Sequence, residues 1–267
     1  MADFIKAVLL GVIEGITEWL PISSTGHMLL FQSAFGMSVS EDFFSLFLVV
    51  IQLFSVCAVF FVFGKRLLPH DKKLPIKLYL RIGIAAFPAA IAGILFDDLI
   101  ERYCYGAFVI AVALIVYGFL FIYIEKIKNP CTYTSAENID NKTALKIGTF
   151  QILSLIPGTS RSGATVTGGM LSGCSRSAAT EFSFLLAIPI MLGASALRLF
   201  KFTESGNTLV GSEWLLLLVG GITAFFVSLA TIRFLSEFVK KHSFRIFGIY
   251  RILLGIILII LLLFGVI

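Results

Sequence analysis

The sequence predicts an all-α polytopic membrane protein with six spanning helices and two re-entrant helical hairpins in an inverted-topology repeat. Composition, six long apolar stretches and two similar polar motifs support this prediction. The 267 residues are 58% hydrophobic and only 14% charged, whereas soluble proteins average about 25% charged residues. The mean hydropathy is +0.99. This composition indicates an integral membrane protein.

Six stretches are long and apolar enough to cross a bilayer, because a spanning helix needs about 20 residues. They cover roughly residues 43–63, 78–96, 106–124, 182–200, 214–235 and 246–266. The N-terminal apolar stretch differs from them, since Glu14 and Glu18 lie inside it and no small-residue cleavage site follows. We therefore expect that stretch to be retained as structure, not removed as a signal peptide.

Two short polar segments resemble each other across the halves of the chain. Residues 14–27 contain two glutamates, a proline, the run Ser-Ser-Thr-Gly and a histidine. Residues 151–165 contain a proline, a loop of glycine and hydroxyl residues, and one arginine. Each motif interrupts an apolar segment. Broken hydrophobic segments in corresponding places of two halves indicate a binding site near the membrane midplane.

The two halves also match outside these motifs. Residues 44–48 resemble residues 182–186 at an offset of 138, and Pro21 and Pro157 are 136 positions apart. Because each half would cross the membrane three times, the second copy would be inverted; chance similarity among apolar sequences is the alternative. We expect a single membrane domain over 1–267. Repeat one, about 1–125, would contain a hairpin (3–36) and the spans 43–63, 78–96 and 106–124. Repeat two, about 144–267, would contain a hairpin (144–174) and the spans 182–200, 214–235 and 246–266.

Basic residues gather in three of the connections between spans, and such connections stay in the cytoplasm. They are Lys65, Arg66, Lys72, Lys73 and Lys77, then Lys126, Lys128, Lys142 and Lys146, then Lys240, Lys241 and Arg245. The first hairpin would then enter from the outer side and the second from the cytoplasm. The net charge of +5 fits this topology and contact with lipid headgroups, and does not point to nucleic acid.

Both motifs should meet inside the protein as an anion site. Pro21 and Pro157 end the helices before them, and non-helical backbone at membrane depth is tolerated only inside protein or beside a wet cavity. The following helices, beginning near Thr25 and Ser162, would present unpaired N–H groups to an anion. Capping alone is the alternative use of the hydroxyls. The residues expected at the phosphate are Ser23, Ser24, Thr25, Gly26, Gly158, Thr159, Ser160, Arg161, Ser162 and Thr165.

The two glutamates are candidate metal ligands. Glu14 and Glu18 lie one helical turn apart on one face, where like charges repel. They are tolerable in an apolar segment if they share a divalent cation, share a proton or face water. Carboxylate oxygens suit Mg²⁺ or Ca²⁺, with phosphate oxygens completing the shell. A solvated helix face is the alternative.

Arg161 and His27 are the other candidate site residues. The guanidinium of Arg161 can bind a phosphate through two parallel hydrogen bonds, or it can extend to lipid headgroups. His27 is the only histidine in an apolar context; it would act as general acid/base or as nucleophile, unless it is only a buried structural residue. Arg251 could line the same cavity, and Gln52 is a polar residue in a span without an evident role.

These residues carry a family resemblance. The patterns Glu14-x-x-x-Glu18, Pro21-x-Ser-Ser-Thr-Gly-His27 and Pro157-Gly-Thr-Ser-Arg-Ser-Gly-Ala-Thr165 resemble undecaprenyl-diphosphate phosphatases of the bacitracin-resistance type. The resemblance covers the whole chain in length, span pattern and both motifs. It implies hydrolysis of undecaprenyl diphosphate to undecaprenyl phosphate and inorganic phosphate in the bacterial plasma (inner) membrane. That reaction recycles the carrier lipid for peptidoglycan synthesis and gives bacitracin resistance; the family requires a divalent cation.

The resemblance also assigns roles to residues of this chain. Glu14 and Glu18 would be the metal and acid/base carboxylates, and Ser24 and His27 the candidate nucleophile and proton-transfer group. Arg161 would hold the diphosphate, supported by Ser160, Ser162 and Thr165. The attacking group stays open between Ser24, His27 and water. The expected partners are a polyprenyl diphosphate and membrane lipids, with no nucleic acid and no obligate protein partner evident. The competing function is a transporter or flippase of a phosphorylated lipid or anion, which would use the same inverted-repeat site.

Overall fold

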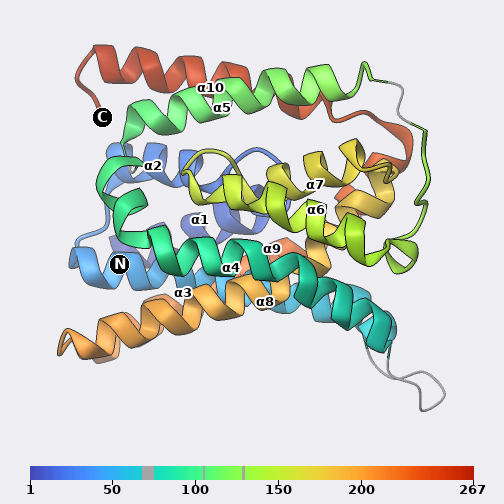
Figure 1. Cartoon of the computed structure of the whole chain (residues 1–267). Coiled ribbons are helices and arrows are strands. Elements are labelled where there is room, and N and C mark those ends of the chain that lie inside the picture. The colour runs from blue at the N-terminus through green and yellow to red at the C-terminus, as the bar shows by residue number, and fades with distance from the viewer. Residues whose placement is uncertain (68–74, 105, 128–129) are drawn as a thin grey trace.

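The structure, a computed structural model, describes residues 1–67, 75–104, 106–127 and 130–267. The predicted all-helical class is confirmed for these residues (Figure 1). The α-helices are α1 (Ala2–Thr17), α2 (Ser24–Phe35), α3 (Glu41–Leu67), α4 (Ile76–Cys104), α5 (Ala107–Ile124), α6 (Asn141–Gln151), α7 (Arg161–Leu171), α8 (Arg176–Glu204), α9 (Gly211–Lys241) and α10 (Arg245–Leu263). Two 3-10 segments, η1 (Ala136–Asn138) and η2 (Ile152–Leu155), flank α6.

The six predicted spans are confirmed as six helices long and apolar enough to cross a membrane: α3, α4 over Ile76–Phe96, α5, α8, α9 and α10. Several of them extend past the apolar stretch that predicted them. The last turn of α3, for example, includes Lys65 and Arg66, because straight-chain basic residues favour the helix and stabilise its C-terminal end. The chain is therefore a multi-pass membrane protein.

The helices form three groups in Figure 1. The pair α5 and α10 lies along one side, and α3, α4, α8 and α9 lie along the other. The four short helices α1, α2, α6 and α7 lie between these groups. Two short helices thus come from each half of the chain, and all four lie between the two groups of long helices.

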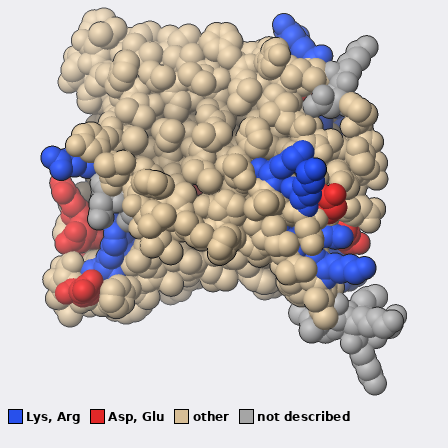
Figure 2. Space-filling model, viewed as in Figure 1, with Lys and Arg blue, Asp and Glu red and all other residues tan. Residues whose placement is uncertain are grey.

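Charged side chains gather at the two ends of the molecule, and an uncharged band separates them in Figure 2. Glu125, at the end of α5, binds both Arg176 of α8 and the backbone N–H of Phe244 before α10. Arg66, at the end of α3, binds Glu181 of α8. The three connections predicted to be cytoplasmic therefore lie at one end of the molecule. Their residues Lys72, Lys73 and Lys128 lie outside the described part of the chain.

Glycines bring the short helices close to helices of the opposite half. A Cβ at Gly11 of α1 would lie 2.5 Å from the carbonyl oxygen of Gly220 in α9, and one at Gly15 would lie 2.8 Å from that of Ala224. Gly148 of α6 meets the backbone of Ala85 in α4 in the same way. Helix α1 is thus packed against the second half and α6 against the first. This exchange brings the loops that follow α1 and α6 together.

Candidate active site

The loops before α2 and α7 share one backbone conformation. Ser23 and Ser160, the N-cap residues of these helices, have φ angles of 73° and 71°. They are the only residues other than glycine with positive φ in the described ranges. Each serine hydroxyl accepts the N–H of the glycine three positions later, Gly26 at 3.4 Å and Gly163 at 3.2 Å. Such conformations are costly without surrounding support, so both loops are held in a defined shape.

A buried ion pair joins the two motifs. Arg161 Nη2 lies 3.1 Å from Glu18 Oε1, and the side chains are only 10% and 6% exposed. Arg161 Nη1 donates to the carbonyl oxygen and the hydroxyl of Ser183 in α8, at 2.8 and 3.3 Å. The pair connects residues 143 positions apart, which no local sequence pattern could predict. It places one cation and one carboxylate where the two loops meet.

The second carboxylate oxygen of Glu18 faces a hydroxyl. Ser24 Oγ donates to Glu18 Oε2 at 2.8 Å, and Gln52 Nε2 of α3 lies 3.4 Å from the same oxygen. Glu18 is therefore oriented from both sides and can accept the proton of Ser24. The contact also explains Gln52, a polar residue in a span that had no evident role in the sequence.

The remaining hydroxyls of the second motif mainly hold the scaffold. Ser162 Oγ contacts the carbonyl oxygens of Glu18 and Leu20, at 3.2 and 3.4 Å, so it ties the second loop to the first. Thr165 Oγ1 is 2.6 Å from Ser183 Oγ, and Ser183 in turn holds Arg161. Both residues are buried. Ser162 thus links the two loops, and Thr165 helps to position Arg161 through Ser183.

Arg251 of α10 binds the backbone of both loops. It is fully buried, and it donates to Pro21 O at 3.2 Å and to Gly158 O and Thr159 O at 2.9 Å each. The rings of Tyr117 and Phe121 lie 5.4 and 5.8 Å from its guanidinium carbon. Only arginine offers several donors in one planar fork. The sequence signal was a charge inside a span, which is costly and usually functional.

His27 contacts α10 as well. Its Nε2 lies 2.6 Å from Tyr250 Oη, its Nδ1 lies 2.7 Å from Ser23 O, and the two rings are stacked at 5.6 Å. These are the bonded partners of the imidazole among the described residues, although the sequence had placed it beside the glutamates. The reason is that His27 lies at the start of α2, which the tertiary fold turns toward α10.

Glu14 is buried, with 3% exposure, and its Oε1 has no hydrogen-bond partner within the described structure. A buried carboxylate oxygen without a partner is costly, so this oxygen is free to accept a proton or to bind a ligand. The described ranges contain no group of three or more His, Cys, Asp or Glu that could hold a metal by itself. A cation here would need oxygen ligands from another source, such as a phosphate.

The other residues predicted to contact phosphate differ in their exposure. Thr159 is buried, whereas Thr25 is exposed. Gly158 has a φ of +94°, and a Cβ there would lie 2.6 Å from the carbonyl oxygen of Ile110 in α5. Its lack of a side chain therefore serves packing on α5, where the sequence suggested approach to a ligand.

Trp19 is a site residue that the sequence analysis missed. Its ring lies 5.6 Å from the guanidinium carbon of Arg161, and its indole N–H donates to Ser55 Oγ at 3.0 Å. Ser55 in turn contacts Ser228 at 2.6 Å, which fixes the ring between α3 and α9. The tryptophan directly after Glu18 could have been singled out as the neighbour of a charged motif.

The chain is similar to known proteins over nearly its whole length. The family model described as bacitracin resistance protein BacA matches residues 7–257. Undecaprenyl-diphosphatase 1 of Clostridioides difficile is 48% identical over 264 residues, covering 96% of this chain and 95% of its own length. An undecaprenyl-diphosphatase of Enterococcus faecalis is 47% identical over 270 residues, covering 97% of each chain. The chain therefore belongs to the bacitracin resistance protein BacA family.

Proposed function

We propose that this chain hydrolyses undecaprenyl diphosphate to undecaprenyl phosphate and inorganic phosphate in the bacterial inner membrane. The reaction would return the carrier lipid to peptidoglycan synthesis. Relatives named undecaprenyl-diphosphatase match nearly the full chain at 47–48% identity. The observation that carries the proposal is Glu18, which binds the hydroxyl of Ser24 with one oxygen and Arg161 with the other. That arrangement combines a hydroxyl, a base and an anion-binding cation at one point.

Arg161 and the two short helices would bind the diphosphate. The first N–H groups of α2 and α7 lack partners in their own helices, apart from those capped by Ser23 and Ser160. They supply partial positive charge where the two loops meet. Donors fixed in place before substrate arrives stabilise the charge that develops on the phosphoryl oxygens. The prenyl tail would remain among the apolar helices.

Ser24 is the nucleophile that the geometry supports best. Its proton would pass to Glu18 Oε2, 2.8 Å away, while the oxygen attacks the terminal phosphorus. The bond from that phosphorus to the bridging oxygen would break, and undecaprenyl phosphate would leave. Water would then hydrolyse the serine phosphate and release inorganic phosphate. Nε2 of His27, hydrogen-bonded to Tyr250 Oη, would hold or deliver a proton once the substrate is bound.

The residues fit a divalent cation. Mg²⁺ commonly uses one or two carboxylates together with substrate phosphates and water, and Glu14 presents a buried oxygen without a partner. Glu14, with Glu18 beside it, would hold Mg²⁺ or Ca²⁺ against the diphosphate. The cation would neutralise phosphate charge in the transition state. The residues of the chain keep the roles assigned above.

We also propose that the pairs α1–α2 and α6–α7 are re-entrant hairpins of an inverted repeat. Three facts support this: the described residues form five α-helices in each half, Ser23 and Ser160 share one conformation, and α1 and α6 each pack on the opposite half. The same architecture suits transporters. Transport of an anion would use Arg161 but gives no reason for a hydroxyl bonded to a carboxylate, so hydrolysis is favoured.

The test is phosphate release from a long-chain prenyl diphosphate by detergent-purified protein, with Mg²⁺ or Ca²⁺ and with excess chelator. We expect release that stops with chelator and returns when the cation is restored. Glu14→Gln should raise the cation concentration needed for half-maximal activity, because it removes a charged ligand. Release that continues with chelator would remove the metal from the proposal. Folded protein without release under any condition would overturn hydrolysis itself.

A further inference from the structure

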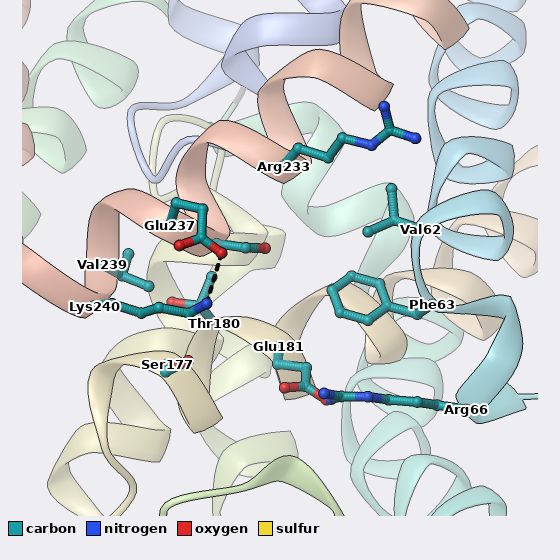
Figure 3. Close-up of a pocket in the computed structure, with 11 residues that line it drawn as sticks. Val62, Phe63, Arg66, Ser177, Thr180, Glu181, Arg233, Glu237, Val239 and Lys240 are labelled. Atoms are coloured by element: carbon teal, nitrogen blue, oxygen red, sulfur yellow. Dashed lines mark hydrogen bonds and ion pairs between the residues drawn. The ribbon is translucent and has the colours of Figure 1, made fainter.

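A second polar cavity lies apart from the candidate active site. Its volume is about 300 Å³, and the last turns of α3, the first turns of α8 and the last third of α9 enclose it (Figure 3). None of the residues assigned above to catalysis or phosphate binding lines it. The cavity therefore needs an explanation of its own.

The cavity has more positive than negative groups. Arg66, Arg233 and Lys240 line it together with Glu181 and Glu237. Arg66 pairs with Glu181, and Lys240 pairs with Glu237 at 2.6 Å. Arg233 has no carboxylate partner within the described ranges, and Figure 3 shows its side chain reaching from α9 toward α3. One arginine is thus left to bind an anion.

Arg233 is exposed and lines the cavity from α9. It lies eight residues before Lys241, the last residue of α9, which places it about 12 Å from that helix end. Its side chain is therefore accessible both to the cavity and to lipid headgroups. A phosphate that enters the cavity would meet a cation there.

Two hydroxyl side chains in the cavity wall could serve as neutral hydrogen-bond donors to a phosphate. Ser177 and Thr180 line the cavity from the first turns of α8, where the helix end carries partial positive charge. Thr180 Oγ1 already donates to the carbonyl oxygen of Arg176. Ser177 is half-buried in the wall, and its hydroxyl can turn to a ligand. An arginine with hydroxyl donors at the N-terminus of a helix is a combination that binds phosphate.

A wall of aromatic rings separates this cavity from the active site. Phe63 lines the cavity, and its ring lies 6.1 Å from that of Phe184. The ring of Phe184 packs edge-on against Trp19 at 5.4 Å, and Trp19 covers Arg161. A ligand in the cavity would therefore not contact Arg161. The two sites are distinct, and the rings of Phe63, Phe184 and Trp19 lie between them.

The position of the cavity favours a lipid as the source of the phosphate. It lies at the end of the molecule predicted to be cytoplasmic, where anionic headgroups attract basic residues. Phe61 of α3 and Phe234 of α9 are 70% and 57% exposed near it. They provide apolar surface on the helices that border the cavity. A headgroup could enter while its tail remains in the hydrocarbon region.

We propose that this cavity binds the phosphate group of an anionic lipid, with Arg233 as the main charged contact and Ser177 as a donor. The lipid is either a prenyl phosphate, the product of the proposed reaction, or a membrane phospholipid. Both present the same chemistry. This inference goes beyond the proposed hydrolysis and does not depend on it.

The test is native mass spectrometry of the detergent-purified protein titrated with a prenyl phosphate, phosphatidylglycerol or diacylglycerol, which lacks phosphate. Arg233→Gln is compared with Arg245→Gln, a control that removes an exposed arginine from the same end of the molecule. Loss of a charge-assisted hydrogen bond should weaken binding of phosphate lipids about tenfold in Arg233→Gln. Arg245→Gln should bind like the wild type, and diacylglycerol binding should not change. Ser177→Ala should give a smaller loss, and phosphate release from the diphosphate should stay within about twofold in both cavity variants.

The outcomes separate the possibilities. Stronger binding of prenyl phosphate than of phosphatidylglycerol identifies the product lipid as the occupant, and equal binding identifies bulk phospholipid. Equal affinities of Arg233→Gln and Arg245→Gln for both phosphate lipids would overturn the proposal. A folded Arg233→Gln that loses turnover together with binding would also overturn it, because the cavity would then belong to the active site. A chain that binds these lipids but releases no phosphate would refute only the proposed hydrolysis.

Discussion

The loops before α2 and α7 have the same shape and different chemistry. In both, a serine with positive φ caps a short helix through a glycine three positions later. The first loop then presents Ser24, hydrogen-bonded to Glu18. The second presents Arg161 at the corresponding position, directly after the capping serine. The shared backbone creates two helix ends near the Glu18–Arg161 contact. The different side chains supply the proposed nucleophile and base from one loop and a cation from the other.

The comparison indicates that one backbone geometry can carry two different sets of side chains. A symmetric site with two arginines or two carboxylate clusters would repel itself. One ion pair across the pseudo-equivalent loops lowers the cost of burying both charges. Arg251, from outside both loops, then holds their backbones together. Substitutions in each loop, and in Arg251, test how much the difference between the loops matters.

The largest effect should come from breaking the ion pair between the loops. Glu18→Gln and Arg161→Ala should each lower phosphate release by about a thousandfold or more, because one removes the base and the other the preorganised cation. Removing one partner of a buried pair also costs roughly 3–5 kcal/mol of stability, so thermal unfolding should be measured alongside. Arg245→Ala is the control for loss of an arginine. Activity near that of the wild type in either variant would remove that residue from the mechanism.

The next largest difference in turnover is expected between a variant of Ser24, at the nucleophile position, and a variant of Ser160, which caps α7. Ser24→Ala should reduce turnover by about a hundredfold or more, as expected when a covalent nucleophile is lost. Ser160→Ala should cost about 1 kcal/mol of stability through loss of the cap and leave most of the activity. Phosphate release and thermal unfolding of both variants give the answer. Similar activities of the two would assign the attack to water or His27.

His27 has no counterpart in the second loop, where Ala164 occupies the matching place. His27→Gln should reduce turnover by about a hundredfold if the imidazole transfers a proton. Tyr250→Phe should cost only a few-fold, because it removes one hydrogen bond and leaves the ring. The pH profile of turnover should lose a limb in His27→Gln but keep it in Tyr250→Phe. An unchanged profile in His27→Gln would leave the imidazole a structural role.

A smaller effect on catalysis than at Ser24 or His27 is expected at Arg251, which touches both loops but no candidate reacting atom. Arg251→Lys keeps the charge but cannot satisfy three carbonyl oxygens in a planar fork. Each unsatisfied buried acceptor costs about 1–3 kcal/mol, so the melting temperature should fall clearly while turnover falls about tenfold. Unchanged stability would show that the loops do not depend on this residue. A selective loss of turnover without loss of stability would place Arg251 at the substrate.

The motifs allowed much of the site to be predicted. Glu18, Ser24 and Arg161 were singled out as a group, and the structure brings them together. Gln52 and Ser183 were not assigned to this group, because they contact it from α3 and α8. Trp19 was not assigned either, although it directly follows Glu18 in the chain. His27 was expected beside the glutamates but contacts Tyr250. Such partners depend on how helices are rotated about their axes, which hydrophobic pattern alone leaves loosely fixed.

The sequence by itself determined the class of molecule, since apolar length dictates spanning helices, and it determined where the helices break, since proline and hydroxyl residues mark the loops. Only the tertiary structure decided which groups meet. Packing of α1 on α9 and of α6 on α4 through glycines brings the loops together, and Arg251 fixes them. The physical reason is that backbone propensity acts over a few residues, whereas the Glu18–Arg161 contact spans 143 positions and depends on close packing of the whole bundle.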